Sequence, residues 1–146
     1  MTIGLLSGAF RLVNRRSGKV LDIKDGSTAD GATAIVWAWP GGTNQQWRFQ
    51  PNRDGSFRLV SVKSGKVLES PGGSTTKGQV LDQWTDNSAA HQWWKVVPTS
   101  GGYYRLVNVK GGLCADAENG ATADGTRIIQ WSTDGGSNQE WQIVAV

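Results

Sequence analysis

Side chains that could hold a ligand recur along the chain at a fixed step of 47 residues. Each set contains a tryptophan, whose flat ring offers a large apolar face. Each also contains a carboxylate, which accepts strong charge-assisted hydrogen bonds, and two neighbouring polar residues that can donate or accept others. The three sets are Asp22, Trp37, Asn44 and Gln45; Glu69, Trp84, His91 and Gln92; and Asp116, Trp131, Asn138 and Gln139. These residue types are suited to non-covalent binding by stacking and hydrogen bonding.

Catalysis is not indicated by the same residues. The chain has one histidine, His91, and no acid and nucleophile lie at a recognisable spacing from it. The loop at 73–78 resembles a phosphate-binding loop only superficially, because Gln79 stands where lysine is required. No His/Cys cluster has zinc spacing and no acidic loop has calcium spacing. We therefore expect no enzymatic activity, no metal and no cofactor.

The 47-residue step also organises the rest of the chain. A Gln-x-Trp triplet occurs three times, and a run of alternating apolar and polar residues precedes each copy at constant distance. A fixed period of this length indicates a repeat architecture. Three copies fill nearly all of the 146 residues. We expect a single domain, 1–146, built from repeats at about 6–52, 53–99 and 100–146.

Short apolar runs separated by glycine-rich turns predict four strands in each repeat and no α-helix. The expected strands are 10–14, 19–23, 33–39 and 45–49; 57–61, 66–69, 79–84 and 92–97; and 104–108, 113–117, 126–131 and 139–144. Three equal groups of four strands favour a closed all-β fold with pseudo-threefold symmetry, the β-trefoil. A propeller usually needs at least four blades, so three repeats argue against it.

The Gln-x-Trp triplets and their surroundings resemble the ricin B-type (R-type) lectins and carbohydrate-binding module family 13. The triplets are Gln45-Gln46-Trp47, Gln92-Trp93-Trp94 and Gln139-Glu140-Trp141, and each follows an aromatic residue ten positions before its tryptophan. The resemblance covers the full chain. It implies that Trp47, Trp94 and Trp141 pack inside the trefoil. It also implies that Trp37, Trp84 and Trp131, here called the platform tryptophans, stack against a sugar ring.

The resemblance further implies how the polar residues act in repeats one and three. Asp22 and Asp116 stand where the family places a carboxylate that binds two adjacent hydroxyls. Asn44 and Asn138 stand where it places an amide that contacts the same hydroxyls. Gln45 and Gln139 would then support the aspartates. We expect these six positions, together with Trp37 and Trp131, to form two sugar sites.

Repeat two departs from this pattern. Glu69 moves the carboxylate outward by one methylene, and His91 replaces the asparagine. Lys77 stands where the other repeats hold Asp30 and Asp124, which predicts a different loop beside Trp84. We expect the site of Glu69, Trp84, His91 and Gln92 to be weak or absent. Two residues before the platform tryptophan, where plant members carry a polar residue, the chain has Ile35, Asp82 and Ile129.

Composition limits the remaining partners. The net charge is +3 and the basic residues are scattered, which disfavours nucleic-acid binding. No apolar run is long enough to span a membrane, and the first seven residues lack the features of a signal peptide. Cytoplasmic synthesis and excision from a secreted protein both stay open. Cys114 is the only cysteine, and Thr133 occupies the position where secreted relatives place its disulfide partner.

These observations predict a non-catalytic carbohydrate-binding protein with two or three shallow sites. Its expected partners are glycans, with galactose-type or other terminal or backbone residues as ligands. Two alternatives stay open: a protein-binding β-trefoil, such as an inhibitor or a toxin-targeting module, and the binding module of a larger glycoside hydrolase. The sequence leaves the oligomeric state open.

Overall fold

The structure of the protein is a computed structural model that describes residues 7–146. The expectation about a signal peptide concerns the N-terminal residues and falls largely outside this range. Twelve short strands follow one another in chain order: β1 (Phe10–Asn14), β2 (Val20–Ile23), β3 (Ala34–Trp37), β4 (Trp47–Pro51), β5 (Phe57–Ser61), β6 (Val67–Glu69), β7 (Asp82–Trp84), β8 (Trp94–Pro98), β9 (Tyr103–Asn108), β10 (Cys114–Ala117), β11 (Ile128–Trp131) and β12 (Trp141–Ala145). Between residues 7 and 146, no helix is long and apolar enough to cross a membrane.

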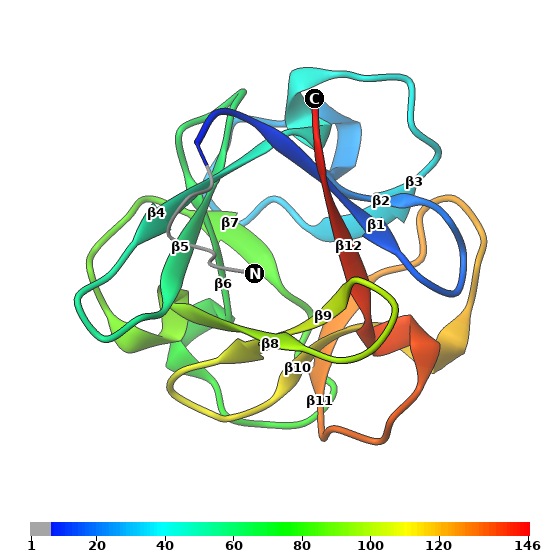
Figure 1. The fold of residues 1–146 in the computed structure, drawn as a ribbon. Coiled ribbons are helices and arrows are strands. Elements are labelled where there is room, and N and C mark those ends of the chain that lie inside the picture. Colours follow the sequence, from blue (N-terminus) through cyan, green and yellow to red (C-terminus); the bar gives the residue numbers. More distant parts are fainter. Residues whose placement is uncertain (1–6) are drawn as a thin grey trace.

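Six of the strands close into a barrel. β1 pairs with β12 and β4, β5 pairs with β4 and β8, and β9 pairs with β8 and β12, so the ring has no free edge. The view in Figure 1 shows the three repeats as three lobes around this ring. The β-trefoil predicted from the repeats is therefore confirmed.

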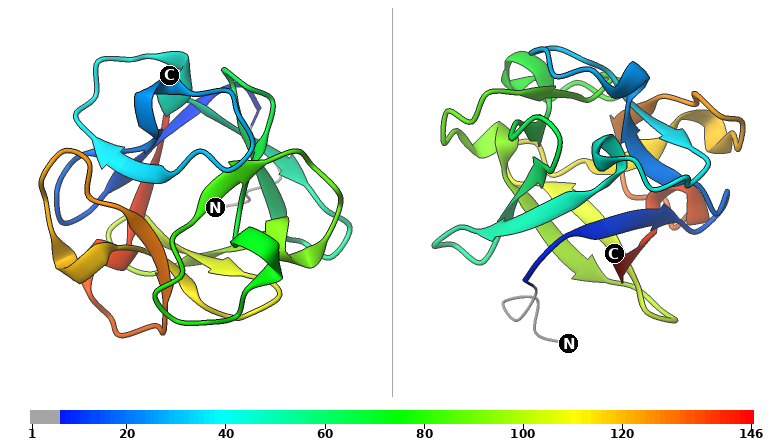
Figure 2. Two further views of the ribbon diagram at one scale, coloured as in Figure 1. Left: turned by 180° about the vertical axis from the view of Figure 1, so that it is seen from behind. Right: turned by 90° about the horizontal axis from the view of Figure 1, so that it is seen from above.

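The other six strands form three hairpins, β2–β3, β6–β7 and β10–β11, which gather at one end of the barrel (Figure 2). Single backbone bridges join neighbouring hairpins at Thr33 and Asp82, Ile35 and Arg127, and Val80 and Ile129. The hairpin ends are thus tied to one another, and the second and third strand of each repeat occupy this end.

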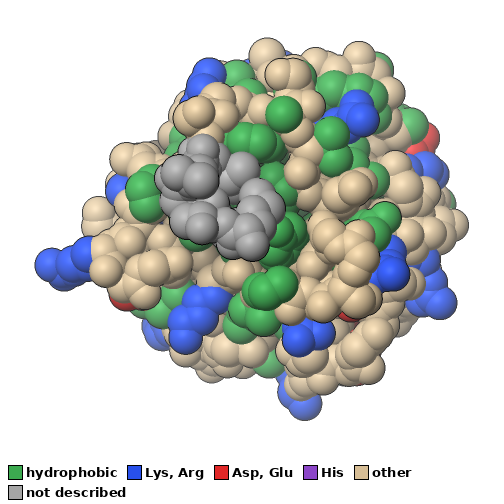
Figure 3. Space-filling view, in the orientation of Figure 1, with side chains coloured by type: hydrophobic (Ala, Val, Ile, Leu, Met, Phe, Trp, Pro, Cys, Tyr) green, Lys and Arg blue, Asp and Glu red, His purple; other side chains and the backbone are tan. Residues whose placement is uncertain are grey.

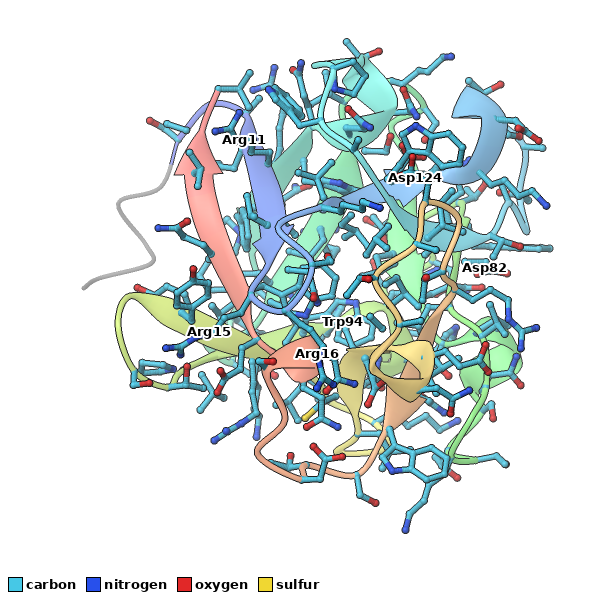
Figure 4. The ribbon with its side chains drawn as sticks, turned by 90° about the vertical axis from the view of Figure 1, so that its right-hand side faces the viewer. Arg11, Arg15, Arg16, Asp82, Trp94 and Asp124 are labelled. Atoms are coloured by element: carbon cyan, nitrogen blue, oxygen red, sulfur yellow. The ribbon has the colours of Figure 1, made fainter. Side chains whose placement is uncertain are left out.

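Alternate residues of the barrel strands point inward and are buried, as the period-two pattern predicts. The largest buried side chains are Trp47, Trp94 and Trp141, each with no exposed surface, and Figure 4 shows Trp94 in the interior. Their indole N–H groups donate hydrogen bonds to backbone oxygens of the second strand in the same repeat, at Leu21, Leu68 and Ala115, over 3.1, 2.9 and 3.2 Å.

The fourth strand of each repeat begins two residues later than the sequence indicated. The glutamine of each triplet lies in a short 3-10 turn instead, at η3 (Thr43–Gln45), η5 (Ala90–Gln92) and η7 (Ser137–Gln139). Each turn is closed by a backbone bond from the next residue, as from Gln46 N–H to the Thr43 oxygen over 3.2 Å. Three further 3-10 turns follow the second strands: η2 (Lys24–Gly26), η4 (Pro71–Gly73) and η6 (Glu118–Gly120).

Cys114 is buried and free, and its Sγ lies 2.9 Å from Oγ1 of Thr133. The position that the resemblance pairs with Cys114 therefore does face it across the β10–β11 hairpin. Burial raises the pKa of the Cys114 thiol, which keeps it protonated and unreactive at neutral pH.

The buried tryptophans give a first prediction. Trp47→Ala should lower the free energy of unfolding by about 3–5 kcal/mol, because it removes a fully buried indole and leaves a cavity. Urea denaturation measures the loss. The matched control is Trp37→Ala, whose ring is 43% exposed and should cost far less. Similar losses for both variants would contradict the division into core and platform tryptophans.

Candidate functional site

In repeat one, the predicted residues come together at the hairpin end. Asp22 lies in β2 among buried neighbours, one residue before the end of the strand, and is only 5% exposed. Asn44 Nδ2 donates to Asp22 Oδ1 over 3.2 Å, and Gln45 Nε2 donates to Asp22 Oδ2 over 2.9 Å. Trp37, at the end of β3, is exposed beside them. Together with Ile35 these side chains line a hollow of about 600 Å³.

The amides fix the Asp22 carboxylate in one orientation. Burial raises the pKa of Asp22 above its ordinary value, and the hydrogen bonds from Gln45 and Asn44 partly offset this effect. A carboxylate has about four acceptor positions, and the two amides occupy two of them. The oriented Asp22 therefore keeps acceptor capacity for hydroxyl groups of a ligand in the hollow.

Repeat three reproduces this geometry. Asn138 Nδ2 lies 3.1 Å from Asp116 Oδ1, and Gln139 Nε2 lies 2.9 Å from Asp116 Oδ2. Trp131 is exposed beside a hollow of about 370 Å³ that Asp116 and Asn138 line. Burial again raises the pKa of the carboxyl, here Asp116. The structure thus brings together all predicted residues of both repeats.

Each platform tryptophan also contacts a loop from the preceding repeat in cyclic order. Asp124, on the loop between η6 and β11, accepts a hydrogen bond from the Ala38 N–H over 3.0 Å, beside Trp37. Asp30 accepts one from the Thr85 N–H over 2.8 Å, beside Trp84. Figure 4 shows Asp124 on the repeat-three loop, next to the blue strands of repeat one.

This arrangement corrects the expectation about Lys77. Its ammonium lies over the Trp131 ring, 6.0 Å from the centroid, and so belongs to the site of repeat three. The loop beside Trp84 is the one that carries Asp30. The backbone explains the shift, because Gly78 N–H donates to the Gln130 oxygen of the next hairpin over 2.8 Å.

A cation from the following repeat completes each site, and sequence reasoning missed it. Lys63 lines the hollow of repeat one, and Arg16 lines the hollow of repeat three. Lys110 lies against η4 in repeat two, where a β-carbon on Gly73 would be 2.7 Å from its Nζ. Figure 4 shows Arg16 at the turn between β1 and β2. Their common 47-residue spacing was the available signal.

Repeat two has a different polar arrangement. Glu69 is buried like Asp22, so its longer side chain does not move the carboxylate into solvent. Gln92 Nε2 and His91 Nε2 both approach its Oε1, over 3.2 and 3.4 Å. Asp82 lies opposite Glu69 in the β6–β7 pair, and its buried Oδ1 has no hydrogen-bond partner among the described residues.

The two carboxyl groups interact strongly. Burial, a hydrogen bond with Glu69, the charge of Glu69 and the charge of Asp30 together raise the pKa of Asp82 to about 8. Asp82 therefore holds its proton at neutral pH and can donate it to Glu69 in their hydrogen bond. In repeats one and three the equivalent positions hold Ile35 and Ile129.

The described residues 7–146 contain no group of three or more His, Cys, Asp or Glu side chains placed to hold a metal ion. On the barrel face in Figure 3, Lys and Arg side chains lie apart from one another around the rim. Neither feature changes the expected class of ligand.

The family model for the ricin-type β-trefoil lectin domain-like family matches residues 4–84, 43–131 and 91–146. The chain belongs to this family. A comparison with curated protein sequences gave no match.

Solved structures extend the family likeness. The crystal structure of ThreeFoil, a designed threefold-symmetric protein, is 41% identical over 96% of this chain and 100% of that one, with a TM-score of 0.94. An exo-β-1,3-galactanase from Clostridium thermocellum is 38% identical over 97% of this chain, with a TM-score of 0.94, but only 31% of the galactanase is covered. A ricin B-like lectin from Macrolepiota procera, solved with lactose, is 24% identical over 97% of this chain and 99% of that one, with a TM-score of 0.83.

The buried carboxyls give a second prediction. A folded-state pKa above the unfolded value of about 3.9 means that folding favours the protonated form, so stability falls as pH rises from about 4 to about 8. Asp22 and Asp116 contribute in the same direction. Asp82→Ile, which copies Ile35 and Ile129, should flatten this decline. Urea denaturation at several pH values measures both proteins, and equal slopes would contradict the assignment.

Proposed function

We propose that this protein is a non-catalytic carbohydrate-binding protein, a lectin, with sugar sites in repeats one and three. The observation that carries the proposal is the matched pair of aspartates, each held by an asparagine and a glutamine beside an exposed platform tryptophan. Membership of a lectin-like family supports it.

The chemistry of a sugar suits this arrangement. A pyranose ring presents one apolar face of C–H groups, which can lie on the ring of Trp37 or Trp131. Its neighbouring hydroxyls can donate charge-assisted hydrogen bonds to Asp22 or Asp116. Such shallow sites should bind weakly, with Kd on the order of millimolar to tens of micromolar. Two sites on one chain would supply avidity toward a surface with many glycans.

A galactose-type residue is the ligand we favour. The 38% identity to part of an exo-β-1,3-galactanase supports this choice. Because this chain spans 31% of that enzyme, the same comparison favours a second candidate function, the binding module of a larger glycoside hydrolase. Both functions place the sugar at the same sites and differ only in what the whole protein does.

A glycan array separates these functions from a protein-binding trefoil. The labelled chain should bind galactose-terminated glycans or galactan fragments at high protein density. An array without hits, together with a protein ligand captured by the same chain, would favour the protein-binding class and overturn our proposal.

A third prediction tests the platform tryptophans. Trp37→Ala combined with Trp131→Ala should abolish binding to the best array ligand, because both stacking surfaces are removed. Both rings are at least 40% exposed, so the melting transition should stay nearly unchanged. Calorimetric titration measures binding, and Trp84→Ala is the matched control that should keep it. Undiminished binding by the double variant would refute the assignment.

A fourth prediction concerns neutral sugars in repeat two. The Glu69 carboxylate is occupied by Gln92, His91 and Asp82, so repeat two should bind a neutral sugar poorly or not at all. A crystal soaked in the array ligand should show density over Trp37 and Trp131 but not over Trp84. Full occupancy over Trp84, with Glu69 bonded to the sugar, is the opposing result.

A further inference from the structure

Repeat two retains an exposed aromatic ring beside a carboxyl pair that the other repeats lack. Trp84 is 42% exposed, as much as Trp37 and Trp131. The β6–β7 register places Asp82 directly opposite Glu69, just as Ile35 lies opposite Asp22 and Ile129 opposite Asp116. Ile35 and Ile129 line the hollows of their repeats, so the side chain of Asp82 occupies the position that faces the ligand.

One oxygen of Asp82 lacks the partner that a buried carboxyl group requires. It is 8% exposed, and its Oδ1 has no hydrogen bond within the described chain. A buried acceptor without a donor costs free energy, so the position favours a ligand that brings a donor. Glu69 already accepts a hydrogen bond from Gln92 and lies within ion-pair distance of His91. Its carboxylate places negative charge beside Asp82.

We propose that repeat two binds a sugar with a free, protonated amine, a non-acetylated hexosamine unit, with the ammonium between Glu69 and Asp82 and the ring on Trp84. The assignment rests on the proposed carbohydrate-binding function. An ammonium carries three N–H donors and a positive charge, so it can satisfy both carboxylates at once. A neutral hydroxyl brings one donor and no positive charge, so it cannot offset the charge of a second carboxylate once Asp82 ionises.

The surrounding charges set the pH dependence. Besides Glu69 and Asp82, the groups around this space are His91 on η5, the exposed Lys110 beside η4, and Asp30 on the loop next to Thr85. His91 and Lys110 lie together near Gly73, while Asp30 contributes negative charge at Asp82. The ammonium takes the place of the proton that Asp82 holds at neutral pH, and that proton is released to solvent. Affinity for the amine should therefore rise from about pH 6 to about pH 7.5.

The test uses the indole N–H signals of the intact protein in NMR titrations, assigned with Trp37→Phe, Trp84→Phe and Trp131→Phe. The probes are the methyl glycosides of galactosamine and glucosamine, their N-acetylated forms, methyl galactoside, and methylammonium chloride. The methyl glycosides of galactosamine and glucosamine, here called the aminoglycosides, should shift the Trp84 signal. Each should bind at least about tenfold more tightly than its N-acetylated form, as expected for a hydrogen bond to a charged group. Affinity should be greater at the higher pH.

Variants identify the groups responsible. Asp82→Ile and the near-isosteric Asp82→Asn should each lower the ratio of amine to N-acetyl affinity by about tenfold or more. Asp54→Asn, on the turn between β4 and β5, makes the same carboxyl-to-amide change away from the hairpin end and is the matched control that should keep the preference. Retention of the thermal transition shows that each variant is folded, and the two Asp82 variants provide independent checks.

Other outcomes overturn the assignment. Equal affinity for amine and N-acetyl forms, an unchanged preference in both Asp82 variants, or methylammonium binding as tightly as the aminoglycosides would each do so. If galactoside shifts Trp37 and Trp131 but no aminoglycoside shifts Trp84, only the repeat-two assignment fails. If no saccharide shifts any of the three signals, the proposed function fails as well.

Discussion

The hydrogen bond from each buried indole to the second strand connects the fold to the candidate sites. Trp47 donates to the Leu21 oxygen, and the residue after Leu21 is Asp22. Gln45, two positions before Trp47, donates to the Asp22 carboxylate. One Gln-x-Trp triplet thus fixes both the backbone before the carboxylate and the carboxylate itself. The 3-10 turn makes this possible, because it directs the glutamine toward the site while the tryptophan enters the barrel.

Each candidate site is completed by all three repeats. The carboxylate and its amides come from one repeat, the loop against the platform tryptophan comes from the preceding repeat, and the cation comes from the following repeat. In repeat one these parts are Asp22, Asp124 and Lys63. The sites therefore depend on closure of the trefoil, and a single repeat could not assemble one. The bridges between neighbouring hairpins hold these contributions in register.

The sequence was sufficient for the repeat architecture and for most contacts within one repeat. The 47-residue step predicted the three copies and the closed barrel, and the family resemblance implied the buried positions of Trp47, Trp94 and Trp141. The same resemblance grouped Asp22 with Asn44 and Gln45, and the structure joins them by hydrogen bonds within one repeat. The start of the fourth strand was missed because a 3-10 turn has no apolar period to distinguish it from a strand.

The 47-residue period could not predict contacts between repeats. A period states which positions are equivalent but not which repeat a loop lies against. Lys77 was therefore assigned to Trp84, whereas backbone pairing brings its loop to Trp131. Arg16, Lys63 and Lys110 have equivalent positions in sequence, yet only the closed structure shows that each lies in a neighbour's site.

Asp82 is a carboxyl at a buried position where the other two repeats hold isoleucine. The barrel does not require a carboxyl there, because Ile35 and Ile129 fill the equivalent positions of the other hairpins. Burial beside Glu69 raises the pKa of Asp82 to about 8, and one of its oxygens stays unpaired. Both effects work against the folded state at neutral pH. Departures from the rules of packing and polar satisfaction are concentrated at functional sites in natural proteins. The cost at Asp82 therefore has its most direct explanation in a ligand that supplies the missing donor.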